Sequence, residues 1–568
     1  MEECDGSLLE RNRFGWEDYL VFSAVLVISM GIGVFFGCFK KQNTAADFLL
    51  GGREMNFWSL GASLTLGFTS AISVLGNTAE MYNYGTQYAM VLIAFAIMVP
   101  VTTFLYLPTF RSLGITSIYE YFDKRYSNRT RLLMSILFVI QTLLYLSVVV
   151  YAPALALRAV TGLDVITASA LIFAVSVVYS SLGGIKAVVW TDTFQFMVII
   201  VALIAVLILG GLVDGDPSVI WQDAQNSSRI EFFNMDPDPR IRHSFWTVIV
   251  GGTFYWIAMN SATQSSVQRL MTAPSNKHAA WAMWLSALGM TVIFSITFYL
   301  GLVAFTHYQD CDPLLNKEIE ATDQLLPFYV MEVASSLPGL SGLFVAGVFS
   351  ASLSTVASSL NALAASTLKD ILVGGFNYKP SEARGALISK GLSVLYGLLG
   401  FVLVFLVMQL GGVLQVAISL NGMLAGAALG TFTLGMYVPW SNEWGAIAGT
   451  IVGFATSLWL CIGAQVVSLS GKLVVERKSV GINCGDDCFV NQPDIPDPNL
   501  VFDGYRVSYL YYTPIAYIVT MIVGVIVSGL TGWEKIENVD PALLSTLIRD
   551  RVKRHVKGIE LETKETNS

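Results

Sequence analysis

The chain carries a succession of apolar runs, each about twenty residues long, between residues 17 and 532. A run of that length crosses the hydrocarbon core of a membrane as a helix, because backbone polar groups in lipid must be bonded within the segment. Only 13% of the residues are charged, about half the share found in soluble domains. We therefore predict an all-α polytopic membrane protein with about thirteen transmembrane helices, near residues 17–38, 57–77, 87–108, 132–157, 166–181, 187–213, 244–264, 280–306, 339–365, 391–412, 415–436, 444–466 and 510–532.

Basic residues are distributed unevenly between the two sides of this predicted bundle. With the N-terminus outside, the inner loops and the C-terminal end hold about 22 of the 33 Lys and Arg residues, and the outer segments hold about 11. Cytoplasmic loops of membrane proteins carry such an excess. The bias predicts an outer N-terminus and an inner C-terminus, with one transmembrane domain over residues 1–532 and a cytoplasmic tail over 533–568.

The predicted outer side carries two features typical of an extracellular surface. Asn226 begins an Asn-Ser-Ser sequon, which predicts glycosylation. An oxidising exterior also permits disulfides. Four cysteines allow three pairings, which the sequence leaves open; they are Cys4, Cys311, Cys484 and Cys488.

Small and polar residues interrupt two of the predicted spans. They fill residues 61–71 in the second span, and residues 251–253 and 260–264 in the seventh. Such residues pack helices closely in membranes, but broken helices in transporters use freed carbonyls to coordinate ions. Two interrupted spans, five spans apart, predict an inverted repeat. Its halves would cover about residues 57–213 and 244–436.

The ninth predicted span is rich in hydroxyls. In a helix, Ala351, Ser354 and Thr355 share one face, which brings two hydroxyls and a backbone carbonyl together. Neutral oxygens suit a hard cation, although Ser and Thr also bond back to their own helix.

One acid, Asp192, stands inside a predicted span. An ionisable residue at membrane depth is a functional hypothesis by default. Its position three residues before Gln195 also fits a capping box at the start of a helix. The sequence leaves both interpretations open.

Several classes of protein lack support in the sequence. No GxxxxGK[ST] phosphate loop is present, and the four histidines are scattered without an HExxH pair. The spans contain neither the Arg-rich pattern of a voltage sensor nor the TVGYG loop of a potassium pore. Basic patches with interleaved aromatic residues, typical of nucleic-acid binding, are also missing. These absences favour a secondary transporter over an enzyme.

Four segments resemble the sodium/solute symporter family. The most specific reads YSSLGGIKAVVWTD at residues 179–192, and the others read GITSIYEY at 114–121, YAPALAL at 151–157 and VQR at 267–269. The resemblance extends from near residue 17 to near residue 532. It is stronger to the anion branch, which includes monocarboxylate, multivitamin and iodide transporters, than to the sugar branch.

This resemblance implies a LeuT-like 5+5 inverted-repeat fold with extra helices and a sodium site between the second and ninth spans. Asp192 matches an acid that supports the site, while Gln195 and Gln264 match polar residues linked to ion binding in the anion branch. The implied sodium ligands are the carbonyls of Leu66, Thr69 and Ala351 and the hydroxyls of Ser354 and Thr355.

Substrate contacts follow less directly from the resemblance. Phe68, Ser73 and Trp256 occupy positions that should face the central cavity, and these positions differ among members of the branch. Aromatic residues in a helical bundle are also common as simple packing residues.

The expected function is sodium-coupled import of a small organic anion across the plasma membrane by alternating access. A monocarboxylate or a vitamin such as biotin or pantothenate would be the substrate. Sodium/iodide or sugar/polyol symport is the alternative within transport, and a sodium-sensing receptor or leak channel is the alternative of another class. The expected partners are the anion, sodium and the lipid bilayer, without nucleic acid or an obligate protein.

Overall fold

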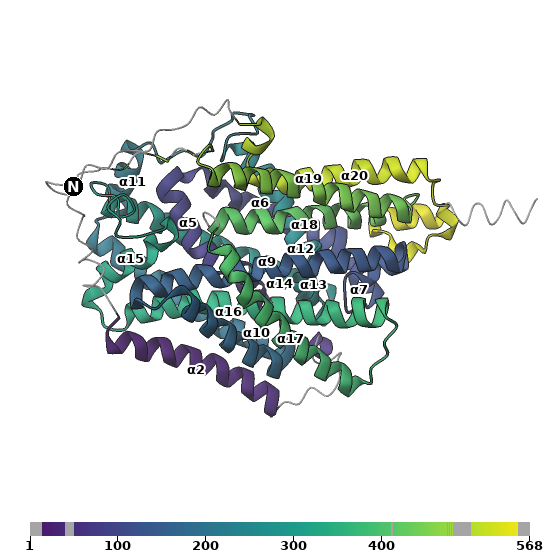
Figure 1. Ribbon diagram of the computed structural model, residues 1–568, viewed down its shortest axis with the longest axis horizontal. Coiled ribbons are helices and arrows are strands. Elements are labelled where there is room, and N and C mark those ends of the chain that lie inside the picture. The colour runs from purple at the N-terminus through teal and green to yellow at the C-terminus, as the bar shows by residue number, and fades with distance from the viewer. Residues whose placement is uncertain are drawn as a thin grey trace, which may run out of the picture.

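The computed structural model is a bundle of long helices that run roughly along its longest axis (Figure 1). The structure describes residues 14–39, 50–409, 413–473, 475, 477–478, 480 and 501–554. Within these ranges the regular elements are all helical, without a β-strand. The predicted all-α class is therefore confirmed.

Each predicted apolar run coincides with one or more helical elements. The first half of the bundle contains α2 (Trp16–Cys38), α4 (Phe57–Phe68), α5 (Ala71–Tyr84), α6 (Val91–Val101) with its continuation α7 (Leu107–Leu113), α9 (Asn128–Thr161) and α10 (Val165–Val213). The second half contains α12 (Gly252–Ser261), α13 (Gln264–Met271), α14 (Asn276–His307), α16 (Leu340–Ser366), α17 (Glu382–Val407), α18 (Val413–Tyr437), α19 (Glu443–Leu469) and α20 (Tyr512–Leu530). Short helices α8 (Glu120–Arg125), α11 (Pro217–Asn226) and α15 (Leu325–Val333) lie between them.

Ten described helices are long and apolar enough to cross a membrane on their own, and the bent pair α4–α5 forms an eleventh candidate. The predicted fifth span appears as a shorter apolar helix, Val165–Val178. The seventh is divided into short helical pieces. The multi-pass architecture is therefore confirmed, whereas the count of thirteen and the orientation of the termini stay predictions.

The second span is broken where the sequence places its hydroxyls. Helix α4 ends at Phe68, α5 begins at Ala71, and the two axes differ by 57°. Thr69 leaves the helical region with φ −99° and ψ 86°. Ser70 is extended and caps α5 by accepting a hydrogen bond from the Ile72 backbone N–H.

The seventh span is broken in the same manner. Helix α12 ends at Ser261 and α13 begins at Gln264. Between them, Thr263 is extended with φ −107° and ψ 139°. Broken helices at equivalent places in the two halves are the arrangement that the inverted-repeat prediction required.

The predicted fifth and sixth spans are one element, α10, kinked at Gly184 with φ 58° and ψ −162°. Only glycine adopts this conformation easily, which explains the second glycine of the Gly-Gly pair. Asp192 lies eight residues beyond the kink, within continuous helix. The interpretation of Asp192 as a helix cap is therefore wrong.

Helix α16 forms the centre of the molecule. Its residues from Ser350 to Ser366 are all buried, and it packs against α10, α2, α9 and α4. Figure 1 shows α2 at the edge of the bundle, beside α10 and α16. The hydroxyl-rich helix is therefore enclosed by protein, where its polar groups need protein or ion partners.

On the predicted outer side, Cys311 takes part in a disulfide, as expected. Cys4, Cys484 and Cys488 lie outside the described residues, so the pairing stays open. Asn226, the predicted glycosylation site, is exposed at the end of α11.

Candidate functional site

The break in the second span lies against α16, and three of the implied sodium ligands meet there. The Thr355 hydroxyl lies 3.2 Å from the Leu66 carbonyl oxygen and 3.1 Å from the Ala351 carbonyl oxygen. All three residues are buried. Neutral oxygens from two helices thus converge on one point, and this is the chemistry that a hard cation requires.

The other two implied ligands border the same point. Thr69 is the residue at which the chain leaves α4, and Ser354 directly precedes Thr355. Among the described residues, neither the Thr69 nor the Ser354 hydroxyl makes a hydrogen bond of good geometry, although Ser354 lies near Asp192. Buried polar atoms of this kind usually have an ion or ordered water as partner, so the residues present fit a sodium ion.

Asp192 lies beside these residues, on α10, and contacts both α4 and α13. Its Oδ2 atom accepts a hydrogen bond of 2.5 Å from the Ser63 hydroxyl and pairs with Arg269 at 3.2 Å. Arg269 also donates to the Ser63 carbonyl at 2.5 Å and to the Ser358 hydroxyl. Both charged groups are buried, and such a pair is tolerated only when hydrogen bonds satisfy its remaining atoms.

Gly67 makes room for this guanidinium. A Cβ atom on Gly67 would lie 1.8 Å from Arg269 Nη1, well inside any allowed contact. The glycine therefore has a packing role beside its place near the helix break. Sequence reasoning quoted Arg269 within a motif but gave it no role. The unbalanced charge of Asp192 was the signal that could have pointed to a basic partner.

Gln195 and Gln264 lie away from this cluster. Gln195 donates to the Ser29 hydroxyl at 3.2 Å and so faces the leading helix α2. Gln264 accepts from the Ile118 backbone N–H at 2.8 Å and donates to the Thr116 carbonyl at 3.1 Å. Each glutamine therefore makes its hydrogen bonds away from the hydroxyl cage, the name used here for the implied ligands Leu66, Thr69, Ala351, Ser354 and Thr355.

The three implied substrate residues form an aromatic corner at the break. Phe68 and Trp256 meet edge to face with ring centroids 5.9 Å apart, and Trp256 packs in the same way on Phe95 at 4.9 Å. The Ser73 hydroxyl donates to the Phe68 carbonyl at 3.4 Å. Of the three, only Phe68 lines the adjacent cavity.

That cavity has a volume of about 40 Å³ and lies between the two broken helices, α9, α16 and α18. Thr355 and Arg269 line it, so it adjoins both the hydroxyl cage and the buried ion pair. Sequence reasoning missed Gln141 of α9 and Asn421 of α18, two amides that line the cavity. The rest of its lining consists of Gly67, Phe68, Phe138, Thr142, Tyr145, Met259, Thr263, Ser265, Ser266, Ser358 and Ser359.

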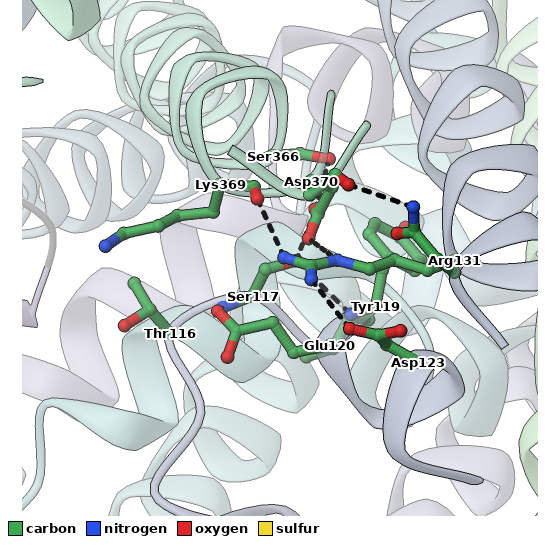
Figure 2. A network of polar contacts seen from close by, with 12 residues as sticks. Thr116, Ser117, Tyr119, Glu120, Asp123, Arg131, Ser366, Lys369 and Asp370 are labelled. Carbon is green, nitrogen blue, oxygen red and sulfur yellow. Dashed lines mark hydrogen bonds and ion pairs between the residues drawn. The ribbon is translucent and has the colours of Figure 1, made fainter. Parts of the chain in front are cut away.

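A polar clamp closes the end of the bundle that the charge bias assigns to the cytoplasm (Figure 2). Asp370, one turn beyond α16, pairs with Arg131 Nε at 2.8 Å and accepts hydrogen bonds from the Ser117 and Ser366 hydroxyls at 2.6 and 2.9 Å. Arg131 also donates to the Lys369 carbonyl at 2.7 Å. The clamp joins the loop before α8 to the ends of α9 and α16.

A second contact lies on the opposite side of the cavity. Arg242 pairs with Glu80 of α5 and donates to the Gln415 side chain of α18 at 2.7 Å. These residues border a vestibule of about 640 Å³ on the predicted outer side. The clamp and this contact are thus two polar contacts outside the small cavity.

Comparison with known proteins agrees with the sodium site that this geometry indicates. A model of the Sodium:solute symporter family matches residues 48–453. The chain belongs to the sodium:solute symporter family. Sodium is therefore its coupling ion, and its family consists of transporters.

Relatives of this symporter cover most of its length. The human sodium-coupled monocarboxylate transporter 2 is 40% identical over 94% of this chain and 87% of the relative. The human sodium/iodide cotransporter is 36% identical over 94% and 86%. A solved structure of a Na+-coupled sialic acid symporter in a substrate-bound, outward-open state superposes with a TM-score of 0.75 at 25% identity, covering 92% of this chain and 99% of that one. The LeuT-like fold is thereby confirmed.

Proposed function

We propose that this symporter imports a small organic anion, a monocarboxylate, together with sodium across the plasma membrane by alternating access. The observation that carries the proposal is the convergence of Thr355, Leu66 and Ala351 oxygens at the break between α4 and α5. The relatives named for monocarboxylate and iodide transport support an anionic substrate.

In this proposal sodium binds where the broken span meets α16. Ligands would be the Leu66, Thr69 and Ala351 carbonyls and the Ser354 and Thr355 hydroxyls. Because Thr355 also lines the central cavity, sodium that holds α4 against α16 also organises the substrate pocket. Coupling then requires that each ligand bind the same conformation preferentially, and the effect is reciprocal.

Asp192 and Arg269 have a supporting role in this mechanism. Their buried pair links α10 to α13 beside the cage and holds the Ser63 carbonyl and the Ser358 hydroxyl. Gln195 and Gln264 would act on ion binding indirectly, by fixing α10 against α2 and α13 against the 116–118 loop. Phe68 and Trp256 would close the pocket, and Ser73 would hold the carbonyl at the break.

Uptake of labelled propionate into cells that express the chain tests the function. We expect accumulation in sodium medium and none when choline replaces sodium, with an inward current if more sodium than anion enters. Iodide is the second candidate substrate, because a sodium/iodide cotransporter is among the relatives. Sodium-dependent accumulation of iodide without propionate would replace the organic anion. Failure to accumulate either solute against its gradient would favour a sensor or leak channel.

The orientation and domain bounds remain part of the proposal: an outer N-terminus, a cytoplasmic tail over 533–568, and repeats over about 57–213 and 244–436. A glycan on Asn226 would check the predicted orientation. Glycosidase treatment should increase the gel mobility of the protein from animal cells but not that of an Asn226→Gln variant. A wild-type chain that carries no glycan would leave the orientation without this support.

A further inference from the structure

A groove of about 730 Å³ runs along the outside of the bundle between α2 and α10, and is called the α2–α10 groove below. Ile28 and Phe35 of α2 and Trp190 and Met197 of α10 line it, and all four side chains are exposed. Because Figure 1 places α2 at the edge of the bundle, this groove opens toward lipid. Its volume is that of a ligand site, and its described lining carries no charged side chain.

A small residue leaves room in the groove. Gly31 of α2 lines it, and a Cβ atom built on Gly31 would meet nothing within 4 Å. The space beside this glycine is therefore available to a hydrocarbon chain, which recovers the dispersion contacts that a void would lose.

One end of the groove has the features of a membrane–water interface. Trp190 is the first residue of α10 that lines the groove, and tryptophan is enriched at such interfaces. Lys186 lies one turn before Trp190 on the same face of α10, toward the end that the charge bias assigns to the cytoplasm. Because a lysine near a helix end extends its ammonium group to the interface, the groove has an apolar body and a cationic end.

The cationic end carries positive charge that the protein leaves unpaired. Within the described part of the chain, neither Lys186 nor Arg53 forms an ion pair. The turn that precedes Arg53 packs on the lysine, since a Cβ atom on Gly51 would lie 3.3 Å from Lys186 Cγ. The neighbouring Glu54 is exposed to solvent. Basic residues at the cytoplasmic surface attract anionic lipid headgroups.

We propose that the α2–α10 groove binds one molecule of phosphatidylserine, with an acyl chain along the groove and the headgroup on Lys186. This anionic lipid belongs to the cytoplasmic leaflet, the side on which the predicted orientation places Lys186. The bound lipid adds to the contacts that hold α2 against α10, which include the hydrogen bond from Gln195 to the Ser29 hydroxyl. The inference goes beyond the proposed function and does not depend on which anion is carried.

The groove and the sodium-site support lie on neighbouring residues of α10. Thr193 lines the groove and its hydroxyl lies 3.4 Å from the Ser59 carbonyl oxygen of α4. Asp192, the preceding residue, accepts a hydrogen bond from Ser63, one turn further along α4. A lipid that holds α2 on α10 therefore steadies the segment that carries Asp192 and should raise the affinity for sodium.

Native mass spectrometry of the purified full-length chain tests the site. In mixed micelles with equal amounts of phosphatidylserine and phosphatidylcholine, the wild type should retain one phosphatidylserine at least fivefold more often than one phosphatidylcholine. Lys186→Gln should remove this preference, because the headgroup loses its cation. Gly31→Phe places a ring in the groove and should reduce retention of phosphatidylserine at least fivefold.

Two adjacent residues of α17 provide matched controls. Lys390 is half-buried like Lys186, and a Cβ atom on Gly391 meets nothing within 4 Å. Neither residue belongs to the described lining of the groove. Lys390→Gln and Gly391→Phe should retain phosphatidylserine as the wild type does, which separates the groove from a general effect of a lost lysine or a filled glycine.

Thermal unfolding gives a second measurement, because sodium that binds the folded chain raises its unfolding midpoint. The half-saturating sodium concentration of the wild type should be at least threefold lower with phosphatidylserine than with phosphatidylcholine. In Lys186→Gln the two lipids should give the same value.

Each outcome decides a separate point. Equal retention of the two lipids by the wild type, or unchanged retention of phosphatidylserine in both groove variants, would overturn the lipid site. A wild-type dimer that retains no lipid and that Gly31→Phe abolishes would also overturn it, because a second copy would then cover the groove. A sodium half-saturation that is the same in both lipids would overturn the link to sodium. Failure of the chain to accumulate propionate would count against the proposed function alone.

Discussion

Thr355 shows how one side chain can join two parts of a transporter. Its hydroxyl contacts the Leu66 carbonyl on the broken helix and the Ala351 carbonyl on its own helix. Back-bonding to the residue four positions earlier is common for threonine in helices. The contact with Leu66 is different, because it depends on a break that brings a second helix within reach.

Removing both hydroxyls of the cage should abolish sodium-dependent uptake. We expect Ser354→Ala with Thr355→Ala to reach the cell surface and to lose uptake, because two of the five proposed sodium ligands disappear. Thr355→Ser retains a hydroxyl and should keep measurable uptake with a higher half-saturating sodium concentration. The measurement is uptake as a function of sodium concentration, with surface labelling as the control. Normal sodium dependence of the double variant would refute sodium binding by these hydroxyls.

Gly67 should tolerate no side chain. In Gly67→Ala the new methyl group would collide with the Arg269 guanidinium, which then cannot keep its contacts with Asp192 and Ser63. We expect a loss of sodium-dependent uptake of at least tenfold. Gly211→Ala is the control, because a Cβ atom there meets nothing within 4 Å. Equal uptake by the two alanine variants would show that the guanidinium position is unimportant.

Asp323 should make stability depend on pH. Burial raises the pKa of this carboxyl, in the loop before α15, to about 6. The folded state therefore holds a proton between about pH 4 and 6 that the unfolded state releases, so stability falls as pH rises through this window. The full penalty, at most about 3 kcal/mol, is present above pH 6.

Asp323→Asn removes this penalty and still offers an acceptor to the Val413 N–H, which the carboxylate contacts at 3.1 Å. The apparent unfolding midpoint of the variant should exceed that of the wild type at pH 7.5 and approach it at pH 4.5. A constant difference between the two proteins across this range would contradict a raised pKa at Asp323.

At the scale of elements, the clamp around Asp370 connects segments that the sequence separates by more than two hundred residues. Ser117 precedes α8, Arg131 belongs to α9, and Asp370 follows α16. A buried ion pair adds little net stability, but removing one partner leaves a buried charge and costs about 3–5 kcal/mol. The clamp therefore joins these elements only while both Arg131 and Asp370 are present.

Breaking the clamp should open the predicted cytoplasmic side. Asp370→Asn removes the buried counter-charge of Arg131 and leaves it only the exposed Asp123 carboxylate at 3.2 Å, so Ile118, which is 2% exposed, should become accessible. We expect Ile118→Cys to react faster with a membrane-permeant maleimide when combined with Asp370→Asn than without it. The chain without Ile118→Cys provides the background labelling. Adding Arg131→Gln removes the positive charge that Asp370 no longer balances and should partly restore protein yield. Equal labelling rates would argue against a closing role.

At the scale of the whole molecule, the chain is a membrane bundle enclosed around α16. Lipid-facing helices such as α17 and α20 are apolar on their exposed sides, whereas the buried α16 carries the hydroxyls. This inversion of the soluble pattern places polar groups inside, where they coordinate ions or pair with each other.

The sequence by itself determined the all-helical membrane class and the places of the two helix breaks. Hydrophobic length sets a span, and clustered Gly, Ser and Thr mark where a helix can break, so both are local properties. Only the tertiary structure decided what lies across a break. Arg269 pairs with Asp192, Gln141 meets Asn421, and Gln264 holds the 116–118 loop. These partners come from distant segments, and no local pattern specifies which apolar helix faces which.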